Sequence, residues 1–262
     1  MTPTDEVGPI QAYLRENARR QYLVEALPPF SLFFHPSDPF PSFSYAIPDG
    51  PVAQVSAQTL DALRAAFRRR GRVARFEFFE AFAPGLPAAL SAGGFREEAR
   101  QWSLRCSPPD LRPAAPVPGL EVLELAPDSP SADLRGFSLA QRQGFNPQDL
   151  TPPGQAEEDE LRRNLRDSGW QAYLARLSGE PAGAAICFQP IGGICEVAGV
   201  ATRAPFRRRG IASYLTWLAT RDAFTRGAQV ACLTAEDERA GQVYQRVGYQ
   251  PFSIMLAYID AL

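Results

Sequence analysis

Hydrophobic and polar positions in the second half of the chain change their period from one segment to the next. Alternating or short continuous apolar runs predict strands over 120–125, 170–177, 182–188, 194–201, 229–234 and 252–258. A period near 3.6 residues predicts helices over 132–143, 155–167, 211–226 and 238–247. The clearest helical stripe consists of Ile211, Leu215, Leu218, Ala219 and Ala223. This succession of strands and helices predicts an α/β (α+β) fold.

The first half shows the same kind of pattern. It predicts a helix over 8–27 that Pro28-Pro29 ends, and a second helix that Ser56 or Thr59 caps and that runs to Arg70. Aromatic and β-branched runs predict strands, and a short helix ends at Gly93-Gly94. The strands are expected over 31–34, 43–47, 73–82 and 100–106, and the short helix over 86–92.

A proline-rich segment separates the two halves. Residues 107–119 contain Pro108, Pro109, Pro113, Pro116 and Pro118. Proline at this density excludes both a helix and a central strand, so the segment is expected to be a stiff, extended linker. The predicted organisation is therefore a domain over 1–107, a linker over 108–118 and a domain over 119–262.

Composition and charge narrow the function classes. The 262 residues are 45% hydrophobic and 21% charged, as in a soluble globular protein. With 27 basic and 29 acidic residues, the net charge of -2 provides no overall field for nucleic acid. No apolar run is long enough for a membrane helix, and the N-terminus lacks the pattern of a secretory signal. The sequence therefore predicts a cytoplasmic protein that binds neither nucleic acid nor a membrane.

The cysteines and the single histidine narrow the chemistry further. Cys106, Cys187, Cys195 and Cys232 form no CxxC pair, and three of them lie in apolar, strand-like runs, so they are expected to be buried free thiols. His35 is the only histidine. A metal site or a Ser–His or Cys–His dyad is therefore not expected, and acid–base chemistry is left to carboxylates, tyrosines or basic side chains.

The string Phe-Arg-Arg-Arg-Gly occurs twice, in opposite contexts. At Phe67–Gly71 it ends a predicted helix, where Gly71 suits the C-cap and arginines suit the negative end of the helix dipole. At Phe206–Gly210 it lies between a strand and the start of a helix. Three cations at a helix N-terminus are unfavourable unless an anion joins them, so the second copy predicts a phosphate site. The alternative for this copy is a solvated charged turn.

Two motifs in the second half carry a family resemblance. Arg207-x-x-Gly210-x-Ala212 resembles the (Arg/Gln)-x-x-Gly-x-(Gly/Ala) pyrophosphate loop of the GCN5-related N-acetyltransferases, the GNAT superfamily. Ala240-x-x-x-Tyr244-x-x-x-Gly248-Tyr249 resembles that family's A-x-x-x-Y-x-x-x-G-(F/Y) segment. Both motifs occur in the family's order, and the resemblance covers residues 119–259.

The resemblance implies a binding site for acetyl-CoA as cosubstrate. The pantetheine arm would lie along the strand that ends near Val200, and Gly199 is expected to mark a bulge that opens a cleft there. The pyrophosphate would lie on backbone N–H groups, with Arg207 framing the loop. Asp237 stands where many members have Asn, so it either weakens one contact or caps the following helix. The implied cosubstrate-binding residues are Val200, Ala201, Thr202, Arg207, Arg208, Arg209, Gly210, Ile211, Ala212, Ser213 and Asp237.

The resemblance also implies two catalytic residues. Tyr244 would protonate the departing CoA thiolate, and its ordinary pKa of about 10 is close to that of a thiol. Glu196, on the strand before the loop, would be the general base, directly or through water. The alternatives are a packing tyrosine at 244 and a surface carboxylate at 196.

An internal repeat extends the resemblance to the first half. Residues 71–95 and 227–249 follow the same course of strand, helix and glycine turn, and Leu90 stands where the second copy has Tyr244. Residues 52–57 take the place of the phosphate loop without its Arg-x-x-Gly. The expected architecture is thus a tandem of two GNAT-like domains, each a mixed, mostly antiparallel central sheet flanked by helices, with a degenerate N-terminal copy.

The predicted function is transfer of an acetyl group from acetyl-CoA to a primary amine of a small molecule or peptide, by direct attack. The alternative is a non-catalytic protein that binds or senses acyl-CoA. A nucleic-acid binder that uses the arginine triplet is disfavoured by the net charge. No metal is expected, and the protein is expected to be a monomer or homodimer; the acceptor has no pattern that names it.

Overall fold

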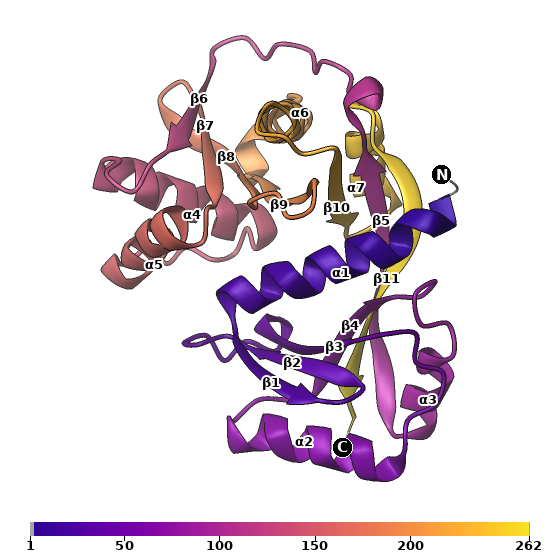
Figure 1. Ribbon diagram of the computed structural model, residues 1–262. Helices are drawn as coiled ribbons and strands as arrows, with labels where there is room; N and C mark the ends of the chain where they lie inside the picture. Colours follow the sequence, from indigo (N-terminus) through magenta and orange to yellow (C-terminus); the bar gives the residue numbers. More distant parts are fainter. Residues whose placement is uncertain (1–2, 262) are drawn as a thin grey trace. The chain divides into compact units, whose positions relative to one another are not determined.

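The computed structural model describes residues 3–261 (Figure 1). Its strands form one eleven-stranded sheet in the order β1-β2-β3-β4-β11-β5-β10-β9-β8-β7-β6. The helices are α1 (Pro3–Gln21), α2 (Ala57–Arg69), α3 (Leu86–Ala92), α4 (Ser131–Phe145), α5 (Gln155–Asp167), α6 (Ile211–Thr225) and α7 (Glu238–Gln245). The strands are β1 (Leu23–Leu27), β2 (Phe30–Phe34), β3 (Ser44–Pro48), β4 (Arg75–Phe79), β5 (Phe95–Cys106), β6 (Leu120–Leu125), β7 (Gln171–Leu177), β8 (Glu180–Cys187), β9 (Ile194–Thr202), β10 (Val230–Ala235) and β11 (Gln250–Asp260).

Each predicted helix and strand is present, but some of their bounds differ. Strand β5 begins at Phe95 and not at residue 100, α1 begins at Pro3 and not at residue 8, and the end of α1 differs most. The helix expected over 8–27 ends at Gln21, and β1 follows from Leu23. Pro28-Pro29 closes a hairpin in which Leu27 pairs with Phe30 and Leu23 with Phe34. The two prolines therefore join two strands, because pairing with the fully buried β2 outweighs the helical pattern of the segment before them.

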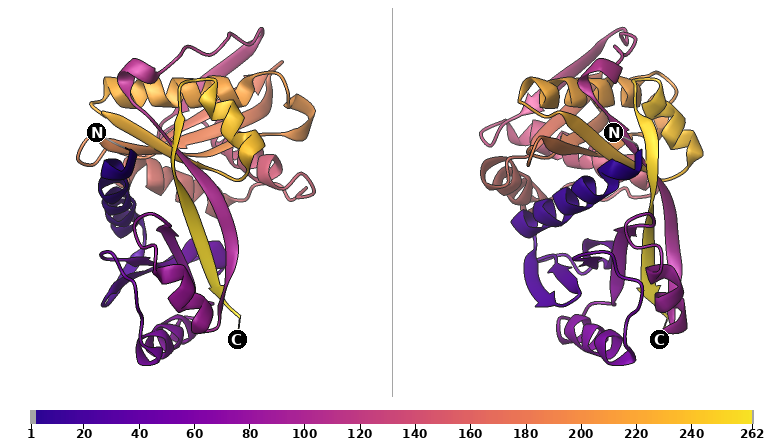
Figure 2. Two further views of the ribbon diagram at one scale, coloured as in Figure 1. Left: turned by 90° about the vertical axis from the view of Figure 1, so that its right-hand side faces the viewer. Right: turned by 45° about the vertical axis from the view of Figure 1, so that its right-hand side comes forward.

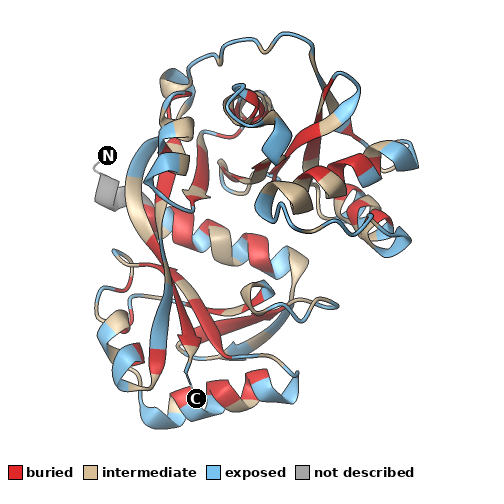
Figure 3. Ribbon diagram, turned by 180° about the vertical axis from the view of Figure 1, so that it is seen from behind, coloured by how far each residue is buried: buried red, intermediate tan, exposed pale blue. Residues whose placement is uncertain are grey.

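The chain forms two compact units, which are described separately. The first contains the described residues up to Ser103 together with Thr234–Asp237 and the residues from Pro251 onward. Its core is aromatic, with Phe30, Phe34, Phe67, Phe76 and Phe78 all buried. Helix α2 packs one face on this core and exposes the other (Figure 3). As expected, Ser56 caps α2: its Oγ accepts a hydrogen bond from the Thr59 N–H at 3.1 Å.

The second unit contains Leu104–Leu233 and Glu238–Gln250. An antiparallel meander consists of β6, β7, β8 and β9. Successive side chains along each strand point to opposite faces of the sheet. Leu174 and Ala184 pack with α4 and α5 on one face of the sheet. On the other face, a Cβ on Gly183 would lie 2.9 Å from Ile211 and 3.2 Å from Leu215 of α6. Helices α4 and α5 thus cover one face of this meander, and α6 covers the other.

The last strand of the chain pairs with a strand of the first unit. Strand β11 is antiparallel to β4, with Phe79 opposite Met255 and Arg75 opposite Ile259. Strand β5 in turn lies between β11 and β10 in the sheet order. Strands β5 (purple) and β11 (yellow) appear as long neighbouring strands in Figure 2. Each half of the chain therefore contributes its final strand next to a strand of the other half.

The pairing of strands from both halves of the chain differs from the architecture expected for two separate domains. The fold is α/β with a mixed sheet and flanking helices, but a single sheet replaces the separate central sheets expected for two domains. A division at 1–107, 108–118 and 119–262 remains a proposal, and the compact units differ from it in assigning most of β11 to the first unit. Residues 108–118 are largely irregular, with one short 3-10 helix at Pro108–Asp110.

A fragment of residues 119–262 is expected not to fold as a stable monomer. Without the first half, β11 loses its partner β4 and β10 loses its neighbour β5, which leaves open strand edges that promote aggregation. Circular dichroism and size-exclusion chromatography of this fragment and of the full chain would test the prediction. A monomeric fragment that unfolds cooperatively at the temperature of the full chain would contradict it.

Candidate functional site

Strand β9 carries the bulge expected at Gly199. Ala198 pairs with Ile186 and Ala201 with Ala184, so Gly199 and Val200 together face only Ala185 of β8. Gly199 has φ +58°, a left-handed conformation that favours glycine. Such a bulge bends the strand and leaves backbone groups outside the regular ladder.

Strand β9 also separates from β10. Among the described residues, the parallel pairing between them begins with Val230 opposite Ile194 and ends with Cys232 opposite Glu196. Residues 197–202 of β9 remain paired with β8 only. The segment predicted to hold the pantetheine arm, Val200–Thr202, thus lies where the strand has one unpaired edge, which is where an extended ligand can add backbone hydrogen bonds.

The loop after β9 leads into a helix without a cap. Gly210 is the N-cap residue of α6, and within the described part of the chain no side-chain cap hydrogen bond forms there. The first helical bond runs from the Tyr214 N–H to the Gly210 carbonyl at 3.0 Å. The N–H groups of residues 210–213 donate no hydrogen bond to a described residue. Unsatisfied N–H groups at the positive end of a helix form a site for an anion.

Two loop residues have left-handed backbone conformations. Gly210 has φ +86° and Arg208 has φ +65°. For a non-glycine residue this conformation costs on the order of 1–2 kcal/mol. Alternation of left-handed and right-handed residues turns successive N–H groups toward a common point, as in anion-binding nests. The strain at Arg208 is therefore consistent with a loop shaped for a ligand.

The arginines of the loop differ in what they contact. Arg207 donates from Nε to the Thr202 carbonyl at 3.1 Å and from a terminal nitrogen to the Gly144 carbonyl at 2.7 Å, so it frames the loop from outside. Arg208 and Arg209 are exposed and form no ion pair among the described residues. In the other Phe-Arg-Arg-Arg-Gly string, Arg69 and Arg70 both pair with Glu25, at 3.0 and 2.6 Å.

The first copy of the string is a helix C-terminus, as expected. Gly71 has φ +63°, and the Arg72 N–H donates to the Phe67 carbonyl at 3.0 Å. This bond closes the helix end in the manner of a glycine C-cap. The Phe67 and Arg68 carbonyls at the helix end accept hydrogen bonds from the Gly71 and Arg72 N–H groups, so a local C-cap accounts for this copy of the string.

Tyr244 lies on α7 in the second unit. Its ring packs against Tyr249 with centroids 6.4 Å apart, and its side chain is half-buried. Its hydroxyl forms no hydrogen bond with a described residue. Burial raises the pKa of Tyr244 to about 12, so the hydroxyl stays protonated across the neutral range. The neighbouring Tyr249 is different: it is buried, and its hydroxyl is 2.7 Å from Thr220 Oγ1 of α6.

Glu196 lies at the point where β9 and β10 separate. By the alternation of the strand it shares a face with Ala198, which is opposite Ile186 on the side covered by α4 and α5. The side chain is half-buried. Next to it, burial and then the Glu196 charge raise the pKa of the Cys232 thiol well above its ordinary value. All four cysteines are buried free thiols, as the sequence predicts.

The predicted site residues fall into two groups. Residues 196–213 and Tyr244 belong to the second unit, whereas Asp237 is grouped with the first. Asp237 is exposed and directly precedes α7. Its predicted contact with the cosubstrate stays a prediction. Among residues 3–261, no group of three or more His, Cys, Asp or Glu side chains is arranged to hold a metal ion, and no helix could cross a membrane.

The structure adds two residues that the sequence did not indicate. Gln141 of α4 donates from Nε2 to the Gly199 carbonyl at 2.8 Å. Gly144 packs so closely on β9 that a Cβ there would lie 2.6 Å from the Ala201 Cβ. A glycine near the end of a helix and a half-buried glutamine are common features, so no sequence signal distinguishes these two.

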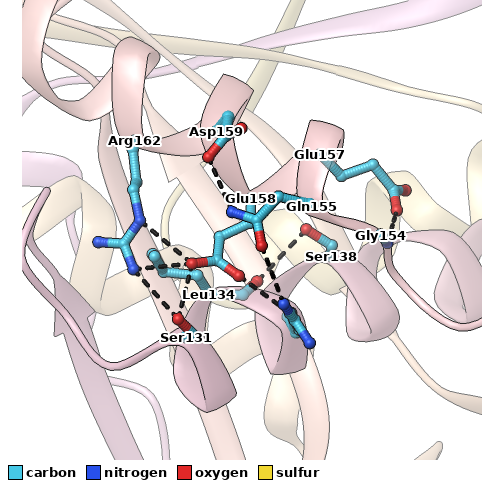
Figure 4. Close-up of polar contacts among 10 residues, drawn as sticks. Ser131, Leu134, Ser138, Gly154, Gln155, Glu157, Glu158, Asp159 and Arg162 are labelled. Atoms are coloured by element: carbon cyan, nitrogen blue, oxygen red, sulfur yellow. Dashed lines mark hydrogen bonds and ion pairs between the residues drawn. The ribbon is translucent and has the colours of Figure 1, made fainter.

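A buried carboxylate joins the two helices on this face of the sheet. Glu158 of α5 accepts hydrogen bonds from Ser131 Oγ at 2.7 Å and from Arg162 at 2.8 Å (Figure 4). It also accepts one from Arg135 Nε at 2.9 Å. The bonds from Ser131 and Arg162, with Arg135, lower the pKa of Glu158 from 4.5 to about 2. Because Ser131 and Arg135 belong to α4, this network fixes α5 on α4.

Replacing Glu158 by glutamine is expected to destabilise the protein in a pH-dependent way. A carboxylate whose pKa is lowered on folding stabilises the protein fully above its unfolded-state pKa, and loses that contribution as the pH falls through the folded value. The wild type should therefore exceed E158Q in melting temperature at pH 7, and the difference should shrink between about pH 4.5 and 2. Thermal melts across this range provide the measurement. A difference that does not change with pH would contradict the role given to the charge.

Comparisons with known proteins agree with this geometry. Residues 138–249 match the model of the Acetyltransferase (GNAT) family. The matched range contains the bulged strand, the uncapped loop and Tyr244. No curated protein matches the chain.

Solved structures share the fold over most of the chain. A GCN5-related N-acetyltransferase from Kribbella flavida is 24% identical, with a TM-score of 0.79, covering 98% of this chain and 96% of its own. Another from Sphaerobacter thermophilus is 17% identical, with a TM-score of 0.61 and coverage of 82% and 71%. A tandem GNAT protein from the clavulanic acid biosynthesis pathway is 14% identical, with a TM-score of 0.62 and coverage of 88% and 77%. The family model matches less than half of the chain, and these neighbours show that the chain shares their fold.

Proposed function

We propose that the protein transfers an acetyl group from acetyl-CoA to a primary amine of a small molecule or peptide. The observation that carries this proposal is the uncapped start of α6, where four successive N–H groups lack partners among the described residues and Arg208 and Gly210 are left-handed. This loop follows directly on a bulged strand with an unpaired edge. The GNAT match over residues 138–249 supports an acyltransferase as the class.

The cosubstrate is expected to follow the backbone from β9 to the loop. The pantetheine arm would add to the free edge of β9 at Val200, Ala201 and Thr202. The pyrophosphate would be held by the loop and first helical turn, where helix dipole and N–H groups favour negative charge. Its ligands would be Arg208, Arg209, Gly210, Ile211, Ala212 and Ser213, with Arg207 framing the loop.

The proposed reaction is direct acyl transfer. The neutral amine nitrogen attacks the thioester carbonyl carbon, and the carbonyl oxygen becomes an oxyanion that backbone N–H groups stabilise. Collapse of this intermediate breaks the carbon–sulfur bond. The nitrogen loses its proton to the base, and the departing thiolate takes a proton from the acid. The products are the N-acetylated amine and CoA.

Tyr244 is the proposed acid. Its hydroxyl is protonated at neutral pH and has no partner among the described residues, so it is available to a thiolate. A pKa of about 12 makes the tyrosine a weaker acid than the sequence alone suggests. The burial that raises it would also raise the pKa of a thiolate formed beside it, which keeps the two groups matched.

Glu196 is the proposed base. It lies on the face of β9 covered by α4 and α5, three residues before the bulge. A carboxylate there can accept the proton of the attacking amine directly or through one water. The surface-carboxylate alternative predicts that Glu196→Gln leaves the rate unchanged.

The first half of the chain has features of a site that no longer binds the cosubstrate. Ser56 caps α2, so the Thr59 N–H in the first turn already has a hydrogen-bond partner. Leu90, at the place of Tyr244, is fully buried. The Phe79 N–H, at the end of β4, is bonded at 2.8 Å by the side chain of Gln11 from α1. These contacts support a degenerate GNAT-like copy, which we include in the proposal.

A coupled assay tests the proposed function against its alternative. Thiol titration of CoA release is measured with a panel of primary amines, and acetyl-CoA binding is measured by calorimetry. Binding together with amine-dependent release supports the transferase. Binding without release from any amine favours a non-catalytic acyl-CoA-binding protein, and absence of binding contradicts both.

A further inference from the structure

The bulge in β9 is held open by a side chain from α4. The Gly199 carbonyl, displaced from the β8 ladder, accepts a hydrogen bond from Gln141 Nε2 at 2.8 Å. The amide lies directly against the glycine, since a Cβ there would be 2.5 Å from that nitrogen. The contact therefore requires both the glycine at 199 and a donor at 141.

This contact fixes the direction of the next N–H group. The peptide bond between Gly199 and Val200 is planar and trans, so its C=O and N–H point in opposite directions. With the carbonyl turned toward α4, the Val200 N–H is turned away from α4. Loss of the Gln141 bond would leave the left-handed bulge free to rotate this peptide.

We propose that Gln141 is a positioning residue that orients the Val200 N–H to polarise the thioester carbonyl, an inference that rests on the proposed acetyl transfer. A backbone donor stabilises an oxyanion only when it is aimed at the place where charge develops. Gln141 touches neither reactant and acts through the Gly199–Val200 peptide. Its helix is in turn fixed by the Glu158 network, through Ser131 and Arg135.

Two substitutions separate this role from packing. Gln141→Leu keeps the length of the side chain and removes the donor. Gln141→Glu places a carboxylate against the carbonyl at neutral pH and a hydrogen-bond donor once it is protonated. Gln143→Leu is the matched control, because Gln143 lies on the same helix and bonds the Asp149 carbonyl and Arg203 instead.

The experiment measures kcat, KM and the acetyl-CoA Kd for the four proteins, with the most reactive amine of the panel, or as basal acetyl-CoA hydrolysis where no amine reacts. For Gln141→Leu, kcat should fall about 10- to 100-fold, with Kd changed by less than about threefold. For Gln141→Glu, the rate relative to wild type should rise as the pH falls through the carboxyl pKa, whereas the relative rate of Gln141→Leu stays flat.

The outcomes distinguish the inference from the function on which it rests. A wild type that binds no acetyl-CoA overturns the proposed function and the inference with it. A wild type that binds and turns over, with kcat unchanged in Gln141→Leu, overturns the inference alone. Equal losses of kcat in Gln141→Leu and Gln143→Leu, or a relative rate of Gln141→Glu that does not respond to pH, also overturn it, because packing would then be sufficient.

Discussion

Gly210→Val is expected to abolish acetyl-CoA binding, whereas Gly71→Val leaves it intact. Both glycines end a Phe-Arg-Arg-Arg-Gly string and both are left-handed, at φ +86° and +63°. A β-branched residue is strained in this conformation at either position. Gly210 forms the uncapped N-terminus of α6, whereas Gly71 follows the end of α2. A side chain and a changed φ are therefore expected to displace the phosphate at Gly210 and not at Gly71.

The pair of variants controls for strain. A Cβ on Gly71 would meet nothing within 4 Å, and one on Gly210 would meet only Val117, at 3.5 Å. Each substitution is therefore expected to lower the free energy of unfolding by a similar amount, on the order of 1–2 kcal/mol, and to lower the melting temperature accordingly. Calorimetric titration should show Kd for acetyl-CoA weakened at least about 100-fold in G210V alone. A folded G210V that retains wild-type affinity would refute the assignment of the loop.

Tyr244→Phe is expected to lower kcat by about 100-fold or more while acetyl-CoA affinity stays close to that of the wild type. The substitution removes the proposed proton donor and keeps the ring that packs on Tyr249. Since burial raises the pKa of Tyr244 to about 12, the wild type should show no loss of rate from ionisation of this group up to about pH 10. Steady-state kinetics from pH 6 to 10 provide both readouts.

Tyr249→Phe is the matched control for this prediction. Its hydroxyl bonds Thr220 inside the second unit, so its loss should cost about 1 kcal/mol of stability and little rate. A Tyr244→Phe enzyme with wild-type kcat would leave Tyr244 as a packing residue. The same drop in kcat for both variants would mean that packing of α7, and not proton transfer, limits the reaction.

The helices, strands and the two arginine strings were predictable because they depend on local information. The period of the apolar residues fixes each segment, and the residues on either side of Phe-Arg-Arg-Arg-Gly decide whether its glycine follows or precedes a helix. The glycine at 199 likewise indicated the bulge. The prediction that the first helix continues to Leu27 was wrong, because the strand that pairs with β1 lies outside the predicted segment.

Features that depend on distant pairs were not predictable. Nothing in residues 250–260 specifies that they pair with β4 and not within their own half. The left-handed φ of Arg208 and the bond from Gln141 to Gly199 arise from the surroundings of these residues, and their sequence neighbours do not encode them. The roles of Tyr244, Glu196 and Asp237 come from the family resemblance and stay predictions.

The pairing of β4 with β11 has a consequence for folding during synthesis. Strand β4 leaves the ribosome early, but its neighbour β11 comes after every other strand of the described chain. Until then, the aromatic core of the first unit lacks Leu256 and Tyr258, which β11 supplies. The β4 edge that pairs with β11 therefore stays unpaired for most of translation. A nascent chain of this kind is exposed to chaperones and to aggregation for longer than one whose halves close in order.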